Sequence, residues 1–110
     1  MPNTMQINIA RDFHDAPAGR YLADGPFSGE LFRTKYLAPA LRAGEVVVVL
    51  DEAEGYGSSF LEEAFGGLVR KEGFSGAELR AKLKLVSAED PSLIDEIWSY
   101  VDDAQSQAAH

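Results

Sequence analysis

With 110 residues, 45% of them hydrophobic and 25% charged, the chain has the length and composition of one globular domain with a single core. It contains no cysteine, which excludes disulfides, thiolate metal sites and a cysteine nucleophile and agrees with the cytoplasmic location that we expect. A net charge of −8 makes direct nucleic-acid binding unfavourable, and no apolar run approaches the ~18 residues that span a membrane.

The first part of the chain predicts a strand and a helix. Residues 5–10 alternate apolar and polar side chains, as a half-buried strand does, and residues 19–22 are a candidate short edge strand. After an Asp-Gly-Pro turn, Ser28 is expected to cap a helix that has Glu30 in its first turn. Pro39 predicts a kink or an early stop in this helix.

The most apolar stretch is residues 46–50, Val-Val-Val-Val-Leu. It predicts a strand that is buried on both faces and central in a mixed, mostly parallel sheet. A glycine-rich turn follows at residues 55–59, and the apolar side chains of residues 61–68 then recur at helical spacing. This turn lies at the carboxyl end of the central strand, where open α/β sheets usually place ligands and partner contacts.

The last part of the chain predicts two helices and a third strand. Ser75 opens a capping box and a short helix, and residues 82–87 alternate as a strand does. Asp90 begins a final helix, whose pattern is lost near residue 102, so we expect a frayed tail at about residues 103–110. The element order predicts a single α/β domain, residues 1–110, with three to four helices on the sheet.

The central turn carries two serines at the start of a helix. Ser59 and Glu62 have capping-box spacing, so Ser59 is expected to cap the helix and Ser58 to lie one residue outside it. Three interpretations stay open for these serines: a plain helix cap, a phosphoacceptor, and a contact to an anion or nucleotide at the exposed amides. The residues of this candidate site are Gly55, Tyr56, Gly57, Ser58, Ser59 and Phe60.

A second group of polar residues precedes and begins the first predicted helix. It is either a polar site close to the central turn or a solvated network of salt bridges. Its members are Arg20, Asp24, Ser28, Glu30 and Arg33.

The sequence offers no signature of catalysis or of metal binding. The carboxylates of Asp51, Glu52 and Glu54 lack the spacing of a metal-binding loop, so no metal or other cofactor is expected. The glycine-rich turn lacks the third glycine of the dinucleotide fingerprint, the lysine of a Walker A loop and the spacing of a nucleophile elbow. We therefore do not expect an enzyme.

A buried strand that ends in Asp, a short loop and then Ser-Ser before an apolar helix resembles the STAS domain of anti-sigma-factor antagonists and sulfate transporters. In those antagonists the corresponding turn reads Asp-Ser-Ser-Gly, and a partner kinase phosphorylates its first serine. Here Gly57 stands before the first serine and Phe60 after the second. The chain is more similar still to the STAS-like DUF4325 family, small proteins of unknown function. The matching segments are residues 19–21, 24–26, 28–30, 55–68 and 90–93.

The resemblance implies a STAS-like α/β fold and a regulatory, signalling role through protein-protein interaction. It further implies a protein partner, either a serine kinase or an anti-sigma-like ATPase, and Ser58 as the phosphoacceptor. A phosphate on Ser58 would add close to two negative charges near Glu54, Glu62 and Glu63 and so repel an acidic or apolar partner surface.

The alternative is a module that senses a nucleotide or another anion at the same helix start. The partner hypothesis predicts an exposed apolar patch around Tyr56 and Phe60. The ligand hypothesis predicts a closed pocket into which Arg20 or Arg33 points.

Overall fold

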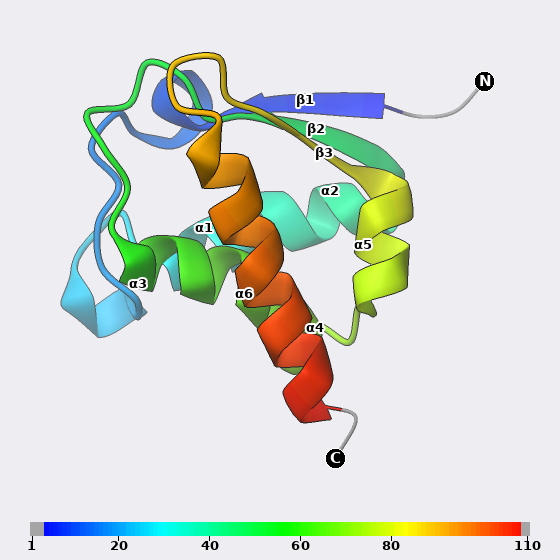
Figure 1. The fold of residues 1–110 in the computed structure, drawn as a ribbon. Helices are drawn as coiled ribbons and strands as arrows, with labels where there is room; N and C mark the ends of the chain where they lie inside the picture. The colour runs from blue at the N-terminus through cyan, green and yellow to red at the C-terminus, as the bar shows by residue number, and fades with distance from the viewer. Residues whose placement is uncertain (1–3, 109–110) are drawn as a thin grey trace.

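The computed structural model describes residues 4–108, whose three strands form one parallel sheet. The strands are β1 (Thr4–Asn8), β2 (Glu45–Val49) and β3 (Leu83–Val86), in the order β1-β2-β3 (Figure 1). The predicted α/β fold and the central position of the valine-rich strand are therefore confirmed. Within residues 4–108 every strand pair is parallel, so the sheet lacks the antiparallel strand of a mixed sheet.

Two longer helical stretches are each built from three consecutive segments. Residues 29–43 comprise α1 (Gly29–Phe32), the π-helical turn η3 (Arg33–Leu37) and α2 (Ala38–Ala43), so Pro39 does not stop the helix. Residues 58–70 comprise α3 (Ser58–Leu61), the π-helical turn η4 (Glu62–Gly66) and α4 (Gly67–Arg70). Helices α5 (Gly76–Lys82) and α6 (Ser92–Ala108) flank β3 in the chain. None of the described helices has both the length and the apolar composition needed to cross a membrane.

The helices cover one face of the sheet and leave the other open (Figure 1). Side chains on the covered face, such as Val46 and Val48 of β2, are 1% and 0% exposed. Val47 and Val49 point to the opposite face and are only partly buried. The prediction that this strand is buried on both faces was therefore wrong, because no described helix packs on the second face.

Residues 19–22 are not the edge strand that the sequence indicated. The carbonyl groups of the first two pair with the start of a helix: Gly19 accepts from the N–H of Gly29 at 2.9 Å, and Arg20 accepts from the N–H of Glu30 at 3.0 Å. A short 3₁₀ turn, η2 (Leu22–Asp24), follows. Gly19 has a φ of +94°, which turns the chain away from an extended path.

Two element ends also differ from the prediction. Strand β1 stops at Asn8, whose side chain accepts a hydrogen bond from the N–H of Arg11 at 3.1 Å and so starts the π-helical turn η1 (Ile9–Phe13). At the other end, α6 continues to Ala108 instead of fraying from about residue 103. Ala104 is buried there, and the side chain of Gln105 accepts from the N–H of Gly76 at 2.8 Å. Residues 109–110 of the expected tail lie outside the described residues.

Candidate functional site

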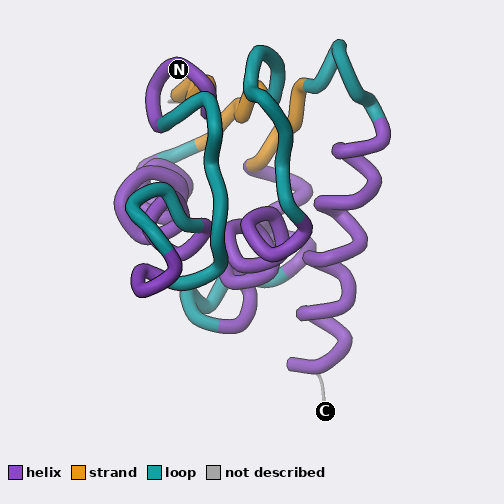
Figure 2. Tube along the Cα trace, turned by 90° about the vertical axis from the view of Figure 1, so that its left-hand side faces the viewer, coloured by secondary structure: helices purple, strands orange, loops and turns teal. Residues whose placement is uncertain are grey.

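The glycine-rich turn joins the end of β2 to the start of α3. From the carboxyl end of β2 the chain runs away from the sheet as an extended loop and enters α3 on the helical side of the molecule (Figures 1 and 2). In Figure 2 the first turn of α3 faces the viewer. The site is thus one layer away from the sheet, at the end where the parallel strands finish.

Helix α3 begins two residues earlier than the capping-box pattern indicated. Gly57 is the N-cap, with φ −73° and ψ 149°, and its carbonyl accepts from the N–H of Leu61 at 3.2 Å. Ser58 and Ser59 are therefore the first two helical residues, and both are exposed. The prediction that Ser59 caps the helix was wrong, because Glu62, its expected partner in the box, bonds to two arginines instead.

The aromatic residues of the turn face inward. Phe60 is 0% exposed, and the hydroxyl of Tyr56 donates to the carbonyl of Leu50 at 2.8 Å. Burial, followed by the nearby carboxylates of Asp51 and Glu89, raises the pKa of Tyr56. The expected exposed apolar patch around Tyr56 and Phe60 is therefore absent, because both rings belong to the core or its margin.

Two exposed apolar side chains lie instead at the start of η2. Tyr21 is 47% exposed and Leu22 is 55% exposed. This segment is bound to the helix of residues 58–70, because Arg20 bonds to Glu62. The exposed pair and the exposed serines therefore flank the same helix.

A buried ion pair joins the two long helical stretches. Arg33 is 2% exposed and Glu63 is 1% exposed. Arg33 Nη1 lies 2.5 Å from Glu63 Oε2 and 2.8 Å from the Glu63 carbonyl oxygen, and Arg33 Nε donates to Glu72 at 3.0 Å. Gly67 makes room for this side chain, since a Cβ at that position would lie 2.2 Å from Arg33 Nη1. Gly67 thus permits the close approach of Arg33 to this helix.

Further charged groups surround this pair. Glu63 also lies 3.3 Å from Lys71 Nζ, 3.5 Å from Arg20 Nη1 and 3.6 Å from Arg70 Nη2. Burial by itself would raise the pKa of Glu63, but the hydrogen bond and the charge of Arg33, helped by Lys71, lower it overall. We name the whole set the ion cluster: Arg20, Arg33, Arg42, Glu62, Glu63, Arg70, Lys71 and Glu72.

The second predicted polar group divides in two. Arg20 and Arg33 join the ion cluster. The other three hold the local backbone: Ser28 Oγ accepts from the N–H of Leu31 at 3.1 Å, Asp24 accepts from the N–H groups of residues 20 and 21, and Glu30 accepts from that of residue 22. The sequence does not identify Glu63 or Glu72 as a partner of Arg33, because these carboxylates lie 30 and 39 residues away from it in the chain.

An open cavity of about 350 Å³ lies beside the turn, between the loop after β2 and the start of α6. Its lining includes the carboxylates of Glu54, Glu89, Asp90 and Glu96. This is neither the closed pocket nor the basic one that the ligand hypothesis predicts, because Arg20 and Arg33 both pair with carboxylates of the ion cluster. Among residues 4–108, no three His, Asp or Glu side chains come close enough together to hold a metal ion.

Comparison with known proteins identifies the family. No curated protein and no solved structure matches this chain. The family model described as a STAS-like domain of unknown function (DUF4325) matches residues 28–93, from the helix cap at Ser28 into the first turn of α6. Since the match covers more than half of the chain and the fold agrees with it, this protein belongs to the STAS-like DUF4325 family.

Proposed function

We propose that this domain is a cytoplasmic regulatory module that binds another protein, and that a phosphate on Ser58 switches the contact. The contact surface would comprise the first turn of α3 and the exposed Tyr21 and Leu22. The partner would be a serine kinase or an anti-sigma-like ATPase, and the domain itself would carry out no catalytic step.

One observation carries this proposal: Ser58 and Ser59 are exposed at the start of a 13-residue helical stretch, and neither is the residue that caps it. By contrast, the hydroxyls of Ser28 and Ser75 cap helices, since each accepts a hydrogen bond from a backbone N–H three residues later. A hydroxyl that does not cap a helix can be phosphorylated while the helix stays intact.

The geometry refines the expected charge switch. A phosphate on Ser58 would lie at the positive end of the helix dipole, which favours it. Glu62 and Glu63 no longer count as repelling charges, because arginine and lysine side chains pair with both. The added charge would therefore change the fold little and act on the surface of the partner, where like charge or desolvation weakens binding.

The test is a titration of the identified partner with Ser58→Asp and Ser58→Ala, together with mass spectrometry of the protein from its native cells. We expect phosphate on Ser58 and binding of Ser58→Asp weakened at least about fivefold, since an interface charge commonly changes the binding free energy by 1 kcal/mol or more. Ser106→Asp is the matched control, because it adds the same charge on an exposed position near the end of α6.

Equal binding by Ser58→Asp and wild type, with no phosphate on Ser58 in cells, would contradict the proposal. The sensing of an anion or nucleotide at the same helix start would then be the remaining hypothesis. It predicts that phosphate or a nucleotide raises the melting temperature. The carboxylates that line the neighbouring cavity make this alternative the weaker of the two.

A further inference from the structure

Strand β3 is an edge of the sheet, with backbone groups free to pair. The carbonyl of Val86 accepts from the N–H of Leu50, so Val86 and Lys84 direct their backbone groups toward β2. Leu83 and Leu85 must then direct theirs to the other side. The N–H of Leu83 is bonded to the carbonyl of Leu79 in α5, which leaves the Leu83 carbonyl and both groups of Leu85 at the edge. Such an edge is a template for an added strand.

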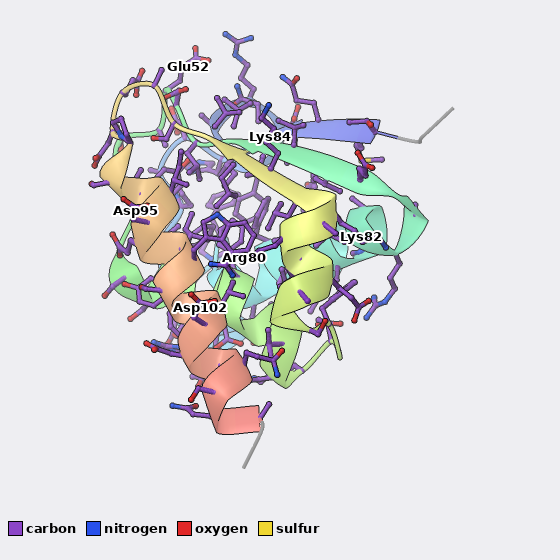
Figure 3. The ribbon with its side chains drawn as sticks, turned by 45° about the vertical axis from the view of Figure 1, so that its right-hand side comes forward. Glu52, Arg80, Lys82, Lys84, Asp95 and Asp102 are labelled. Atoms are coloured by element: carbon purple, nitrogen blue, oxygen red, sulfur yellow. The ribbon has the colours of Figure 1, made fainter. Side chains whose placement is uncertain are left out.

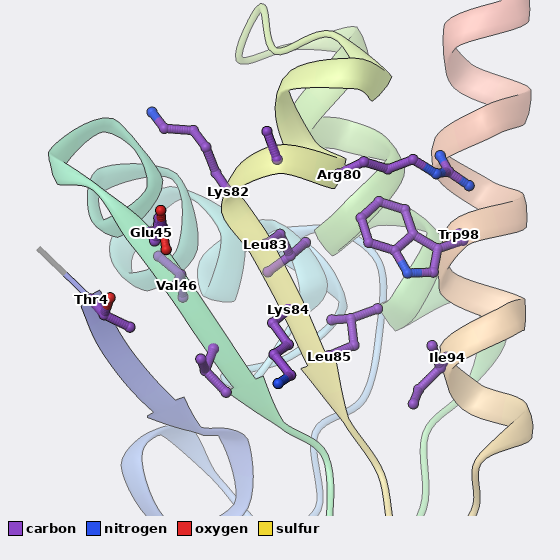
Figure 4. A pocket seen from close by; sticks show the side chains of 12 residues that line it. Thr4, Glu45, Val46, Arg80, Lys82, Leu83, Lys84, Leu85, Ile94 and Trp98 are labelled. Atoms are coloured by element: carbon purple, nitrogen blue, oxygen red, sulfur yellow. The ribbon is translucent and has the colours of Figure 1, made fainter. Parts of the chain in front are cut away.

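A cavity of about 480 Å³ lies at this edge, and its lining runs from α6 across β3 to the first residues of β2 and β1. Ile94 and Trp98 of α6 point across it toward Leu85, as the close view shows (Figure 4). Both are only partly buried, although they pack against the core. The wall opposite β3 is therefore apolar and accessible.

Trp98 is held in place by its neighbours. The guanidinium of Arg80 lies 4.6 Å from the centre of the indole ring and forms two hydrogen bonds to the carboxylate of Asp102, at 2.8 and 3.2 Å. Figure 3 shows Arg80 and Asp102 facing each other between α5 and α6. A ring that is already ordered loses little entropy when a partner covers it, and Trp and Arg are the residues that most often dominate binding.

The charge of this cavity is opposite to that of the chain. Its lining holds three cations, Arg80, Lys82 and Lys84, and one carboxylate, Glu45. Asp102 pairs with Arg80, so one positive charge remains in excess here, whereas the whole chain has a net charge of −8. Lys84 is exposed on the open face of the sheet. The cavity is therefore a local positive region next to a free strand edge.

We propose that the β3 edge binds an extended, acidic segment of a partner protein as a fourth strand of the sheet. Side chains of such a segment would alternate between the two faces of the sheet. Those on the open face would be acidic and lie beside Lys84, and those on the covered face would be apolar and pack on Ile94 and Trp98. A second copy of this chain fits less well, because pairing two β3 strands would bring their lysines together.

This surface is separate from the start of α3, so the inference does not depend on the function proposed above. The test begins with a library of random ten-residue peptides displayed on phage and selected against the whole protein. We expect the selected sequences to alternate Asp or Glu with apolar residues. A synthetic peptide of the selected sequence should shift the amide signals of residues 83–86 and the indole N–H signal of Trp98 in NMR spectra.

Two matched comparisons establish the binding mode. The same peptide with N-methyl groups on alternate residues cannot pair with a strand edge and should bind at least about tenfold more weakly. Lys84→Glu should weaken binding about fivefold or more, because it turns one attraction into a repulsion. Lys84 is exposed, so this variant should melt at the same temperature as wild type, and Ser58→Asp should bind the peptide as wild type does.

Three results would overturn the inference. One is a selection that yields no acidic, alternating sequence. Another is equal binding of the N-methylated peptide, which would indicate charge attraction without strand pairing. The third is a set of NMR shifts that map to another face while Lys84→Glu binds normally.

Discussion

Two consecutive turns of the helical stretch of residues 58–70 differ in how their polar side chains are used. In α3, Ser58 and Ser59 are exposed. In η4, the carboxylates of Glu62 and Glu63 are bound by cations, among them Arg20 and Arg33 from other parts of the chain. The lesson is that the second turn fixes the helix to the rest of the domain, which leaves the first turn free to serve a partner. Mutations in the two turns should therefore separate stability from function.

The largest effect is expected from Glu63→Ala. This change leaves Arg33, which is 2% exposed, without its closest carboxylate. Removal of one partner of a buried ion pair typically lowers the free energy of unfolding by about 3–5 kcal/mol. Urea unfolding at pH 7 measures the loss. Asp102→Ala is the matched control for an exposed pair, because Asp102 is 56% exposed and should cost less than about 1 kcal/mol.

An unfolding midpoint of Glu63→Ala equal to that of wild type would show that the ion cluster does not anchor the helix. The contrast between the two turns would then disappear.

Acid should weaken the same turn without any mutation. The pKa of Glu63 is lowered from the usual 4.5, and the pKa values of Glu62 and Glu72 are lowered as well. The unfolded chain therefore binds protons at a higher pH than the folded one. The stabilisation is fully present above pH 4.5 and is lost as the pH falls through the lower pKa values of the folded state. Urea titrations between pH 6 and pH 3 should show this decline.

Glu63→Gln serves as the comparison for the pH series, because the amide cannot titrate. Its stability should depend less on pH over this range than that of wild type. Parallel curves for the two proteins would mean that Glu63 contributes nothing to the pH dependence.

The glycine pair in the same stretch offers a smaller and more specific effect. A Cβ on Gly67 would lie 2.2 Å from Arg33 Nη1, and Arg33 cannot move without breaking its bond to Glu63. We expect Gly67→Ala to lower the free energy of unfolding by about 2 kcal/mol, since the strain exceeds the gain of about 1 kcal/mol that alanine brings to a helix. Thermal melts or urea unfolding can measure it.

Gly66→Ala is the matched control. Its Cβ would meet only the ends of the Glu62 and Arg70 side chains, which are partly exposed and able to shift. It should therefore be close to neutral. A larger loss at residue 66 than at residue 67 would contradict the assignment of Gly67 to the packing of Arg33.

The parts of this fold that the sequence predicts are those with local causes. Residues 46–50 identify the central strand because four consecutive valines have few other places in a domain of this size. The caps at Ser28 and Ser75 are predictable because each hydroxyl bonds to an amide three residues away. Residues 19–22 were misassigned because the carbonyls of residues 19 and 20 pair with a helix start ten residues later in the chain.

The parts that the sequence does not predict depend on distant residues. Arg33 and Glu63 are 30 residues apart, and nothing in either segment distinguishes a buried charge from a solvated one. The capping-box pattern wrongly predicted Ser59 as the helix cap, again because of residues outside the local sequence. Its glutamate had the right spacing, but Arg20 and Arg70, which bind that glutamate, lie 42 residues before it and 8 residues after it.

The smallest expected effect gives the most direct test of the contrast between serines that cap a helix and exposed serines that do not. Ser28 is 0% exposed and its hydroxyl caps a helix, so Ser28→Ala should lower the free energy of unfolding by about 1 kcal/mol. Ser58→Ala and Ser59→Ala should each stay within about 0.5 kcal/mol of wild type, because both hydroxyls are exposed and neither caps the helix. Urea unfolding of the three variants, with Ser75→Ala as a second example of a capping serine, makes the comparison. If Ser58→Ala costs as much as Ser28→Ala, the hydroxyl of Ser58 has a structural duty, and its exposure would no longer support a regulatory role.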